Sequence, residues 1–207
     1  MSEVSICNQA LSLVGSLSNN GNIVEPLTSL DDNTKEAKLC KLNYEPVRDA
    51  VLSEHDWSFA TRWEDLPASA DPSPGEYPNE FPLPSDVLTV LFVGLDYRHQ
   101  ENWQVENNAI RTDAQTCRCQ VIYRVTDTSK FSALFTQALV ARLAGELAIP
   151  ITNSRTLMEN LFQMYGEKVK LASSRDSQQG RSRRLRSKWL VGARYRDGYR
   201  GDIGPTV

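Results

Sequence analysis

The chain has 207 residues, of which 40% are apolar and 24% are charged, and its formal net charge is -3. Such a composition is typical of a soluble globular protein with a real core, and the length fits one domain or a domain with an inserted lobe. No apolar run reaches the roughly 18 residues needed to span a bilayer, and Glu3 stands where a secretory signal would carry positive charge. We therefore expect no membrane segment and no export.

The first 66 residues predict two helices followed by a strand-like stretch. A helix is expected over residues 3–16, with Gly15 as its stop, and a second helix, capped by Asp31 or Asp32, is expected to run through residues 37–55. Pro46 falls inside the second helix and predicts a kink or a break near Tyr44. Alternating aromatic and polar residues then predict an extended segment over residues 56–66.

The middle of the sequence predicts a small β lobe. Residues 67–84 are rich in proline, which excludes a helix and predicts an extended connection. Residues 86–97, 109–113 and 117–125 are rich in β-branched residues and predict three or four antiparallel strands. So small a sheet would not be stable alone, so we expect it to be an insertion between helical segments that share one core.

Residues 131–172 predict a helical hairpin interrupted once, at Pro150. Apolar residues recur every three to four positions on both sides of the break, and Asp127 and Ser129 are expected to cap the first arm. The expected fold is mainly α, a helical bundle with a small antiparallel β insertion and an extended C-terminal arm, α+β overall. Its expected parts are a body (1–66 and 127–174), a proline-rich connection with the β lobe (67–126) and a basic arm (175–207).

Charge is divided unevenly between the body and the C-terminal arm. Residues 175–207 carry nine basic and three acidic side chains, a net charge of +6, which leaves -9 on residues 1–174. Apolar and aromatic residues are interleaved with the arginines, so we expect an arm that becomes ordered on an acidic partner. The candidate docking residues are Arg181, Arg183, Arg184, Leu185, Arg186, Lys188, Trp189, Leu190, Arg194, Tyr195, Arg196, Tyr199 and Arg200.

No constellation in the sequence predicts catalysis, a metal site or a bound cofactor. His55 is expected to end a helix and His99 to lie in a polar loop, and no common catalytic or nucleotide-binding motif occurs. The four cysteines lack the spacing of a zinc site, and we expect them to be reduced and structural. Paired loop carboxylates of the glycosidase kind remain an alternative for Glu76, Glu80, Glu101 and Glu106, but these are expected to be surface charges. We therefore expect a protein that is not an enzyme.

Taken in order, these elements resemble the head-to-tail adaptor, or tail tubular protein A, family of short-tailed bacteriophages. The resemblance covers about residues 5–172 and depends on order and spacing rather than on one sharp motif. The residues that carry it are Asn8, Ala10, Leu11 and Gly15; Ser29, Leu30 and Asp31; Ala37, Tyr44, Val47, Arg48, Val51 and Leu52; Trp57, Ser58, Phe59, Ala60 and Arg62; Tyr77, Phe81, Pro82, Leu83, Pro84 and Asp86; and the helix from Ala141 to Leu147.

The resemblance implies a structural component of the virion, assembled in the host cytoplasm and located between the portal protein and the tail nozzle protein. It implies a homo-oligomeric ring, dodecameric in such proteins, whose helices surround a channel for the genomic DNA without binding it specifically. The inserted β lobe would meet tail components. The basic arm lies outside the resemblance, and its arginines and aromatics leave open an alternative: a nucleic-acid-binding protein that uses this tail.

Overall fold

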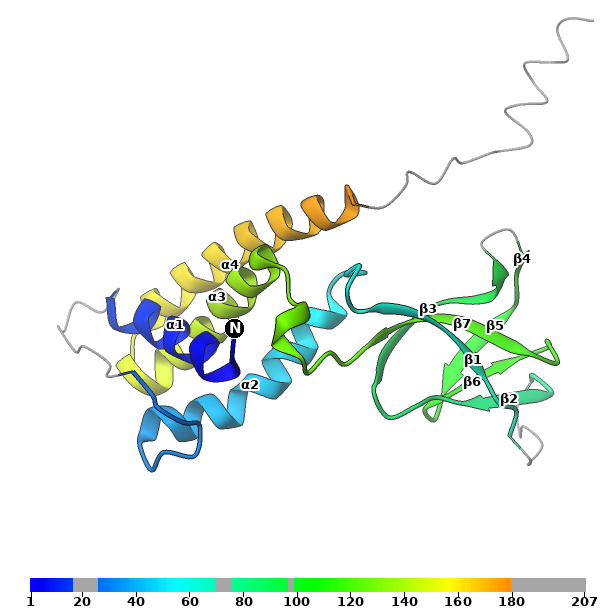
Figure 1. Ribbon diagram of the computed structural model, residues 1–207, viewed down its shortest axis with the longest axis horizontal. Helices are drawn as coiled ribbons and strands as arrows, with labels where there is room; N and C mark the ends of the chain where they lie inside the picture. Colours follow the sequence, from blue (N-terminus) through cyan, green and yellow to red (C-terminus); the bar gives the residue numbers. More distant parts are fainter. Residues whose placement is uncertain (17–25, 70–75, 97–98, 180–207) are drawn as a thin grey trace, which may run out of the picture.

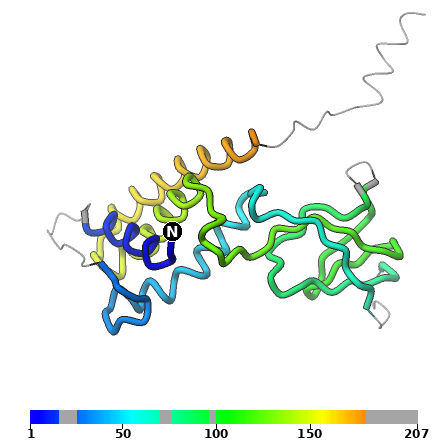
Figure 2. Tube along the Cα trace, in the orientation of Figure 1, coloured from blue at the N-terminus to red at the C-terminus, as the bar shows by residue number. Residues whose placement is uncertain are grey.

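The computed structural model describes residues 1–16, 26–69, 76–96 and 99–179, without the side chains of Ser16, Asp96 and His99. Within these residues the chain forms two lobes, a helical body and a β lobe (Figure 1). The chain passes from the body to the β lobe after the second helix and returns before the third. The two crossings run side by side (Figure 2).

Four helices make the body: α1 (Glu3–Ser16), α2 (Lys35–Ser53), α3 (Ala133–Thr152) and α4 (Arg155–Ser177). All four contribute to one buried cluster, in which α3 is central and packs against each of the others. Small residues on α3, such as Ala138, Ala141 and Ala144, are fully buried, which lets the neighbouring helices approach closely. The helix predicted over residues 3–16 is confirmed.

The helix caps differ from the predicted ones. Thr34 caps α2, and its hydroxyl accepts a hydrogen bond from the backbone N–H of Ala37. Asp32, predicted as a cap, instead accepts hydrogen bonds from the preceding turn, which lower its pKa. Ser132 caps α3, while Asp127 caps the short 3-10 helix η1 (Thr128–Lys130). Short polar side chains can serve a turn or a helix equally well, so the sequence alone did not discriminate between neighbouring candidates.

Neither internal proline breaks its helix. Pro46 lies inside a continuous α2, so of the predicted kink or break near Tyr44 the break is wrong. Pro150 lies in the last turn of α3, and the predicted break of the hairpin comes three residues later, at Asn153. The chain reverses at Asn153, which adopts the left-handed conformation (φ 53°, ψ 27°) and whose N–H bonds to Ile149 O. Asparagine tolerates this conformation better than most residues, and it ends α3 in the manner of a glycine.

The β lobe holds seven strands among the described residues: β1 (Thr61–Leu66), β2 (Asn79–Pro82), β3 (Val87–Asp96), β4 (His99–Gln100), β5 (Trp103–Glu106), β6 (Ala109–Thr112) and β7 (Cys117–Tyr123). They form a four-stranded antiparallel sheet in the order β1-β7-β3-β4 and a three-stranded sheet in the order β2-β6-β5. Asn107 and Asn108, both with positive φ, form the tight turn between β5 and β6.

The prediction of a mainly α fold is therefore wrong, because the strands make two sheets with a core of their own. Phe81 and Ile110 from one sheet and Val93, Cys119 and Val121 from the other are buried in this second cluster. The proline-rich stretch, predicted to be a connection only, contains β2, whose Pro82 stands at an edge where no ladder N–H is needed. The chain is an α+β protein.

By length and composition alone, α3 could cross a membrane. It is instead largely buried among the other helices of the body. Its apolar character therefore has an ordinary explanation as the central helix of a core.

Candidate functional site

All thirteen predicted docking residues, from Arg181 to Arg200, lie outside the described residues. What the structure describes is the place where this part of the chain begins. Helix α4 continues through Arg175 and Asp176, the first residues of the predicted arm, and ends at Ser177. The end of α4 lies between the helical body and the β lobe (Figure 1). The functional site that can be built from side chains is therefore the base of the basic arm.

Asp176 joins the last turn of α4 to the segment that enters the β lobe. Its Oδ2 accepts a hydrogen bond from the backbone N–H of Ser58 at 2.8 Å, and its Oδ1 accepts one from the Ser58 hydroxyl at 2.7 Å. The carboxylate is 7% exposed. Because a hydrogen bond to a charged group is worth about 1.5–3 kcal/mol, this pair fixes the base of the arm on the connection between α2 and β1.

His55 completes this junction from the end of α2. Its Nε2 lies 3.8 Å from Asp176 Oδ2 and 3.5 Å from Ser177 Oγ. A serine–histidine–aspartate relay needs the serine and the aspartate on opposite ring nitrogens, whereas here both approach the same one. The three residues therefore do not form a catalytic triad, and their geometry is that of a structural contact.

Aromatic side chains pack beside the junction formed by Asp176, Ser58 and His55. Trp57 is fully buried, and its indole N–H donates to Val51 O at 2.9 Å. Its ring meets those of His55 and Phe135 edge to face, at centroid distances of 4.9 and 5.0 Å. Trp57 and Phe59 were predicted to lie on a strand, but they occupy a turn and the strand begins at Thr61. This turn packs against α3 through Phe135.

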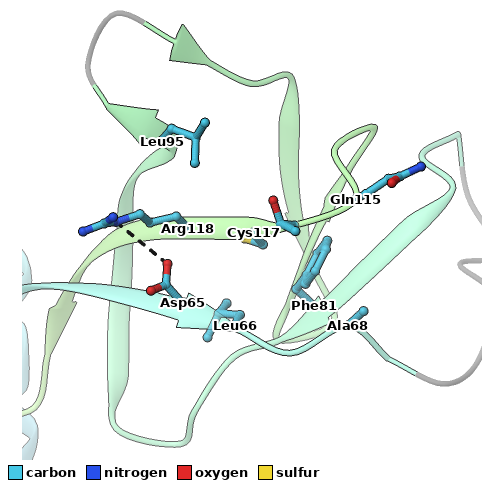
Figure 3. Close-up of a pocket in the computed structure, with 9 residues that line it drawn as sticks. Asp65, Leu66, Ala68, Phe81, Leu95, Gln115, Cys117 and Arg118 are labelled. Carbon is cyan, nitrogen blue, oxygen red and sulfur yellow. Dashed lines mark ion pairs between the residues drawn. The ribbon is translucent and has the colours of Figure 1, made fainter.

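The β lobe has an open pocket of about 400 Å³ at one end of its core (Figure 3). Leu66, Phe81 and Cys117 form its buried apolar floor and belong to the second core cluster. Leu95 stands at the rim and is 67% exposed. The remaining lining residues are Asp65, Ala68, Gln115, Thr116 and Arg118. The pocket thus combines an apolar floor with a polar rim, the usual composition of a site for an apolar group.

The three-stranded sheet is held partly by a charged cluster around Arg111. This side chain is 9% exposed, and it donates to Glu80 at 2.9 Å from its Nε and to Glu106 from its Nη1. Glu80 faces Arg111 directly across the β2–β6 pair. The sequence placed Glu80 and Glu106 in loops as surface charges. Both belong to strands, and their role here is to neutralise a buried guanidinium.

A second polar cluster joins α4 to α3 and to the end of α2. The hydroxyl of Tyr165 donates to Glu54, and the guanidinium of Arg142 lies over the rings of Tyr165 and Phe162 at 5.5 and 4.9 Å. Burial, together with the hydrogen bond to Glu54, raises the pKa of Tyr165 above its ordinary value. This cluster joins three helices of the body through one hydrogen bond and two cation–π contacts.

The four cysteines are free thiols and are all buried. Cys117 and Cys119 face the core of the β lobe from one side of β7. In the body, the neighbouring thiol of Cys40 and burial raise the pKa of Cys7. Across the described part of the chain, no three or more histidine, cysteine, aspartate or glutamate side chains gather closely enough to hold a metal ion.

Sequence reasoning missed Asp176 and Leu95. Asp176 sits in a serine-rich helix end where an aspartate is unremarkable, and its partner, Ser58, is 118 residues away. Leu95 looked like one more apolar residue of a strand, and only its 67% exposure sets it apart. Nothing in the local sequence marks Asp176, because its burial becomes apparent only from the tertiary contact with Ser58.

No protein-family model matches the chain, and a comparison with curated proteins found no match. Any functional conclusion therefore depends on the sequence and on the structure.

Proposed function

We propose that this chain is a structural protein of a bacteriophage virion, the head-to-tail adaptor that connects the portal protein to the tail. The observation that carries the proposal is the order of its elements: two helices, an inserted β lobe and two further helices that complete one core. One of the sequence features that resemble the adaptor family, the segment from Trp57 to Arg62, lies where the chain crosses into the β lobe. Trp57 and Phe59 pack at the crossing into the β lobe.

In this proposal copies of the chain form a ring, a dodecamer by the family resemblance, around the channel through which the genomic DNA passes. The net charge of -9 on residues 1–174 supports a channel wall that does not bind DNA, because like charges repel over the Debye length of about 8–10 Å. The β lobe would contact the tail nozzle protein. The role is structural, with no enzymatic activity and no cofactor.

The basic arm is the part that would dock on the portal or on a neighbouring subunit. The hydrogen bonds from Ser58 to Asp176 support this role, because they hold the start of the arm at a defined place between the two lobes. Eight basic and two acidic side chains follow between residues 180 and 207, a net charge of +6. Arginine suits such docking, because its guanidinium pairs bidentately with carboxylates.

Deletion of residues 181–207 tests this proposal. The shortened protein should keep the circular-dichroism spectrum and the melting temperature of the full chain, but it should no longer attach to portal-containing heads. Negative-stain imaging of the full chain, alone and with the portal, should show rings. Normal docking by the shortened protein would exclude the arm as the docking element, and a full chain that forms no ring with or without the portal would exclude the adaptor.

A nucleic-acid-binding protein is the alternative, favoured by the arginines and aromatics of the arm. A gel-shift titration with double-stranded DNA at rising salt separates the two functions. The alternative predicts binding near physiological ionic strength, with an affinity that falls steeply as salt is added, because phosphate contacts release counterions. The adaptor predicts no DNA binding near physiological ionic strength.

A further inference from the structure

The pocket of the β lobe opens next to an edge of the four-stranded sheet. Among the described residues β1 pairs only with β7, so β1 is the edge strand, and its last residue, Leu66, lines the pocket. In Figure 3 the side chains of Leu95, Cys117 and Phe81 lie around the pocket, which they line. An edge strand can accept an extended peptide, and an adjoining apolar pocket can hold one of its side chains. The lobe therefore offers both parts of a peptide-binding site.

The net charge of the β lobe indicates which kind of peptide it would bind. Residues 61–126 carry ten acidic and five basic side chains, a net charge of -5. Residues 181–200 of the same chain carry eight basic side chains and one acidic side chain, a net charge of +7, and they include the apolar residues Leu185, Trp189, Leu190 and Val191. A basic peptide with apolar residues is complementary to an acidic lobe with an apolar pocket.

The position of the junction brings this segment within reach. Asp176 is bonded to Ser58, and the pocket lies at Leu66, eight residues further along the chain from Ser58. An extended chain spans at most about 3.3–3.6 Å per residue, so the pocket lies within about 29 Å of the junction along β1. Residues 176–179 are helical or in a turn, and the ten residues from Gln179 to Trp189 can span about 33 Å. Binding within one chain is further favoured by the high effective concentration of a tethered ligand.

We propose that the pocket of the β lobe binds the apolar residues between Leu185 and Val191 of its own chain, with the flanking arginines over the acidic lobe. The contact holds the arm on the lobe of a free subunit. A partner that competes for the arm then has to displace it. The contact itself needs no portal, so its failure would leave the adaptor proposal standing.

Photo-cross-linking of the full chain tests this contact. In one variant Leu95 is replaced by p-benzoylphenylalanine, and in a matched control Val105, 44% exposed on the other sheet of the lobe, is replaced in the same way. Irradiation of the Leu95 variant should give cross-links to peptides from residues 181–200 at the mass of the monomer. The Val105 variant should give several-fold fewer. Absence of these cross-links, or cross-links found only between two chains, would overturn the proposal.

Limited trypsin digestion gives a second measurement on natural side chains. Cleavage between residues 181 and 200 should be several-fold faster in Leu95→Asp than in the unmodified full chain, because a buried carboxylate would exclude the apolar residues from the pocket. Val105→Asp should leave that rate unchanged. Equal cleavage rates in all three proteins would contradict the proposal. Because Leu95 is exposed, its substitution should leave the fold intact, which circular dichroism checks.

Discussion

Replacing Asp176 should weaken the joint between α4 and the β-lobe connection more than any exposed carboxylate nearby. Asp176→Ala removes both acceptors of Ser58, at 2.7 and 2.8 Å. Two hydrogen bonds to a charged group would be worth about 3–6 kcal/mol if both donors were left unsatisfied. Ser58 is largely exposed, so water can replace the lost acceptors, and we expect a loss of about 2–3 kcal/mol in the free energy of unfolding.

Urea unfolding, followed by tryptophan fluorescence, measures this loss. With a slope of about 2 kcal/mol/M, the midpoint of Asp176→Ala should fall by about 1–1.5 M. Asp176→Asn keeps one acceptor oxygen and should lose about half as much. Ser58→Ala removes the hydroxyl donor alone, and its effect should not add to that of Asp176→Ala, because the two residues share one contact.

Asp56→Ala is the matched control, since Asp56 is an exposed carboxylate two residues before Ser58. It should leave the midpoint near that of the unmodified protein. Hydrogen exchange at the Ser58 amide gives a local readout, because loss of its acceptor should speed exchange there in Asp176→Ala. If Asp176→Ala and Asp56→Ala gave the same midpoint and the same exchange rate, the reasoning about the junction would be refuted.

Three further predictions concern the body and the β lobe. Arg111→Met should destabilise the β lobe by about 2–4 kcal/mol in urea unfolding, because two carboxylates lose their shared partner, and an unchanged midpoint would contradict this role. Gly166→Ala should raise the melting temperature, because the new methyl group meets nothing within 4 Å and alanine is a better helix former than glycine by about 1 kcal/mol. Gly145→Ala should raise the melting temperature less, or lower it, because its methyl group would lie 3.1 Å from the aromatic ring of Phe162 in α4. Burial raises the pKa of Tyr44 and of Tyr165 in the folded protein. Above about pH 10 the unfolded chain therefore loses these two protons before the folded protein does, and the free energy of unfolding should fall as the pH rises. Double replacement by phenylalanine should flatten this alkaline dependence, and an equally steep fall in the double variant would exclude these two hydroxyls as its cause.

The helices show which parts of the fold could be predicted from the sequence. The apolar periodicity of residues 131–172 and of residues 3–16 predicted real helices, because one buried stripe is a local property of the sequence. The effect of proline was overestimated, because the loss of one N–H is offset when the surrounding helix is packed on a core. Asn153 ended α3 instead of Pro150, a choice that depends on where α4 must turn back.

The β lobe shows what the local sequence pattern could not predict. Its strands are short, and the pairing of β2 with β6 or of β1 with β7 joins residues about 30 to 60 positions apart. Local pattern predicts that such strands exist but not how many sheets they make, because register and sheet order are set by non-local contacts. That is why a second core and a second sheet were missed, and with them the fold class.

For the candidate site, the sequence by itself determined the division of charge: an acidic body and a basic arm with interleaved aromatics. The net charge of a segment is the sum over its residues, so it follows from the sequence without a structure. Only the tertiary structure decided where that arm begins, because the contact of Asp176 with Ser58 spans 118 residues. It also decided that Leu95, Phe81 and Cys117 surround one pocket, since three strands from different parts of the chain must first pair and pack to bring them together.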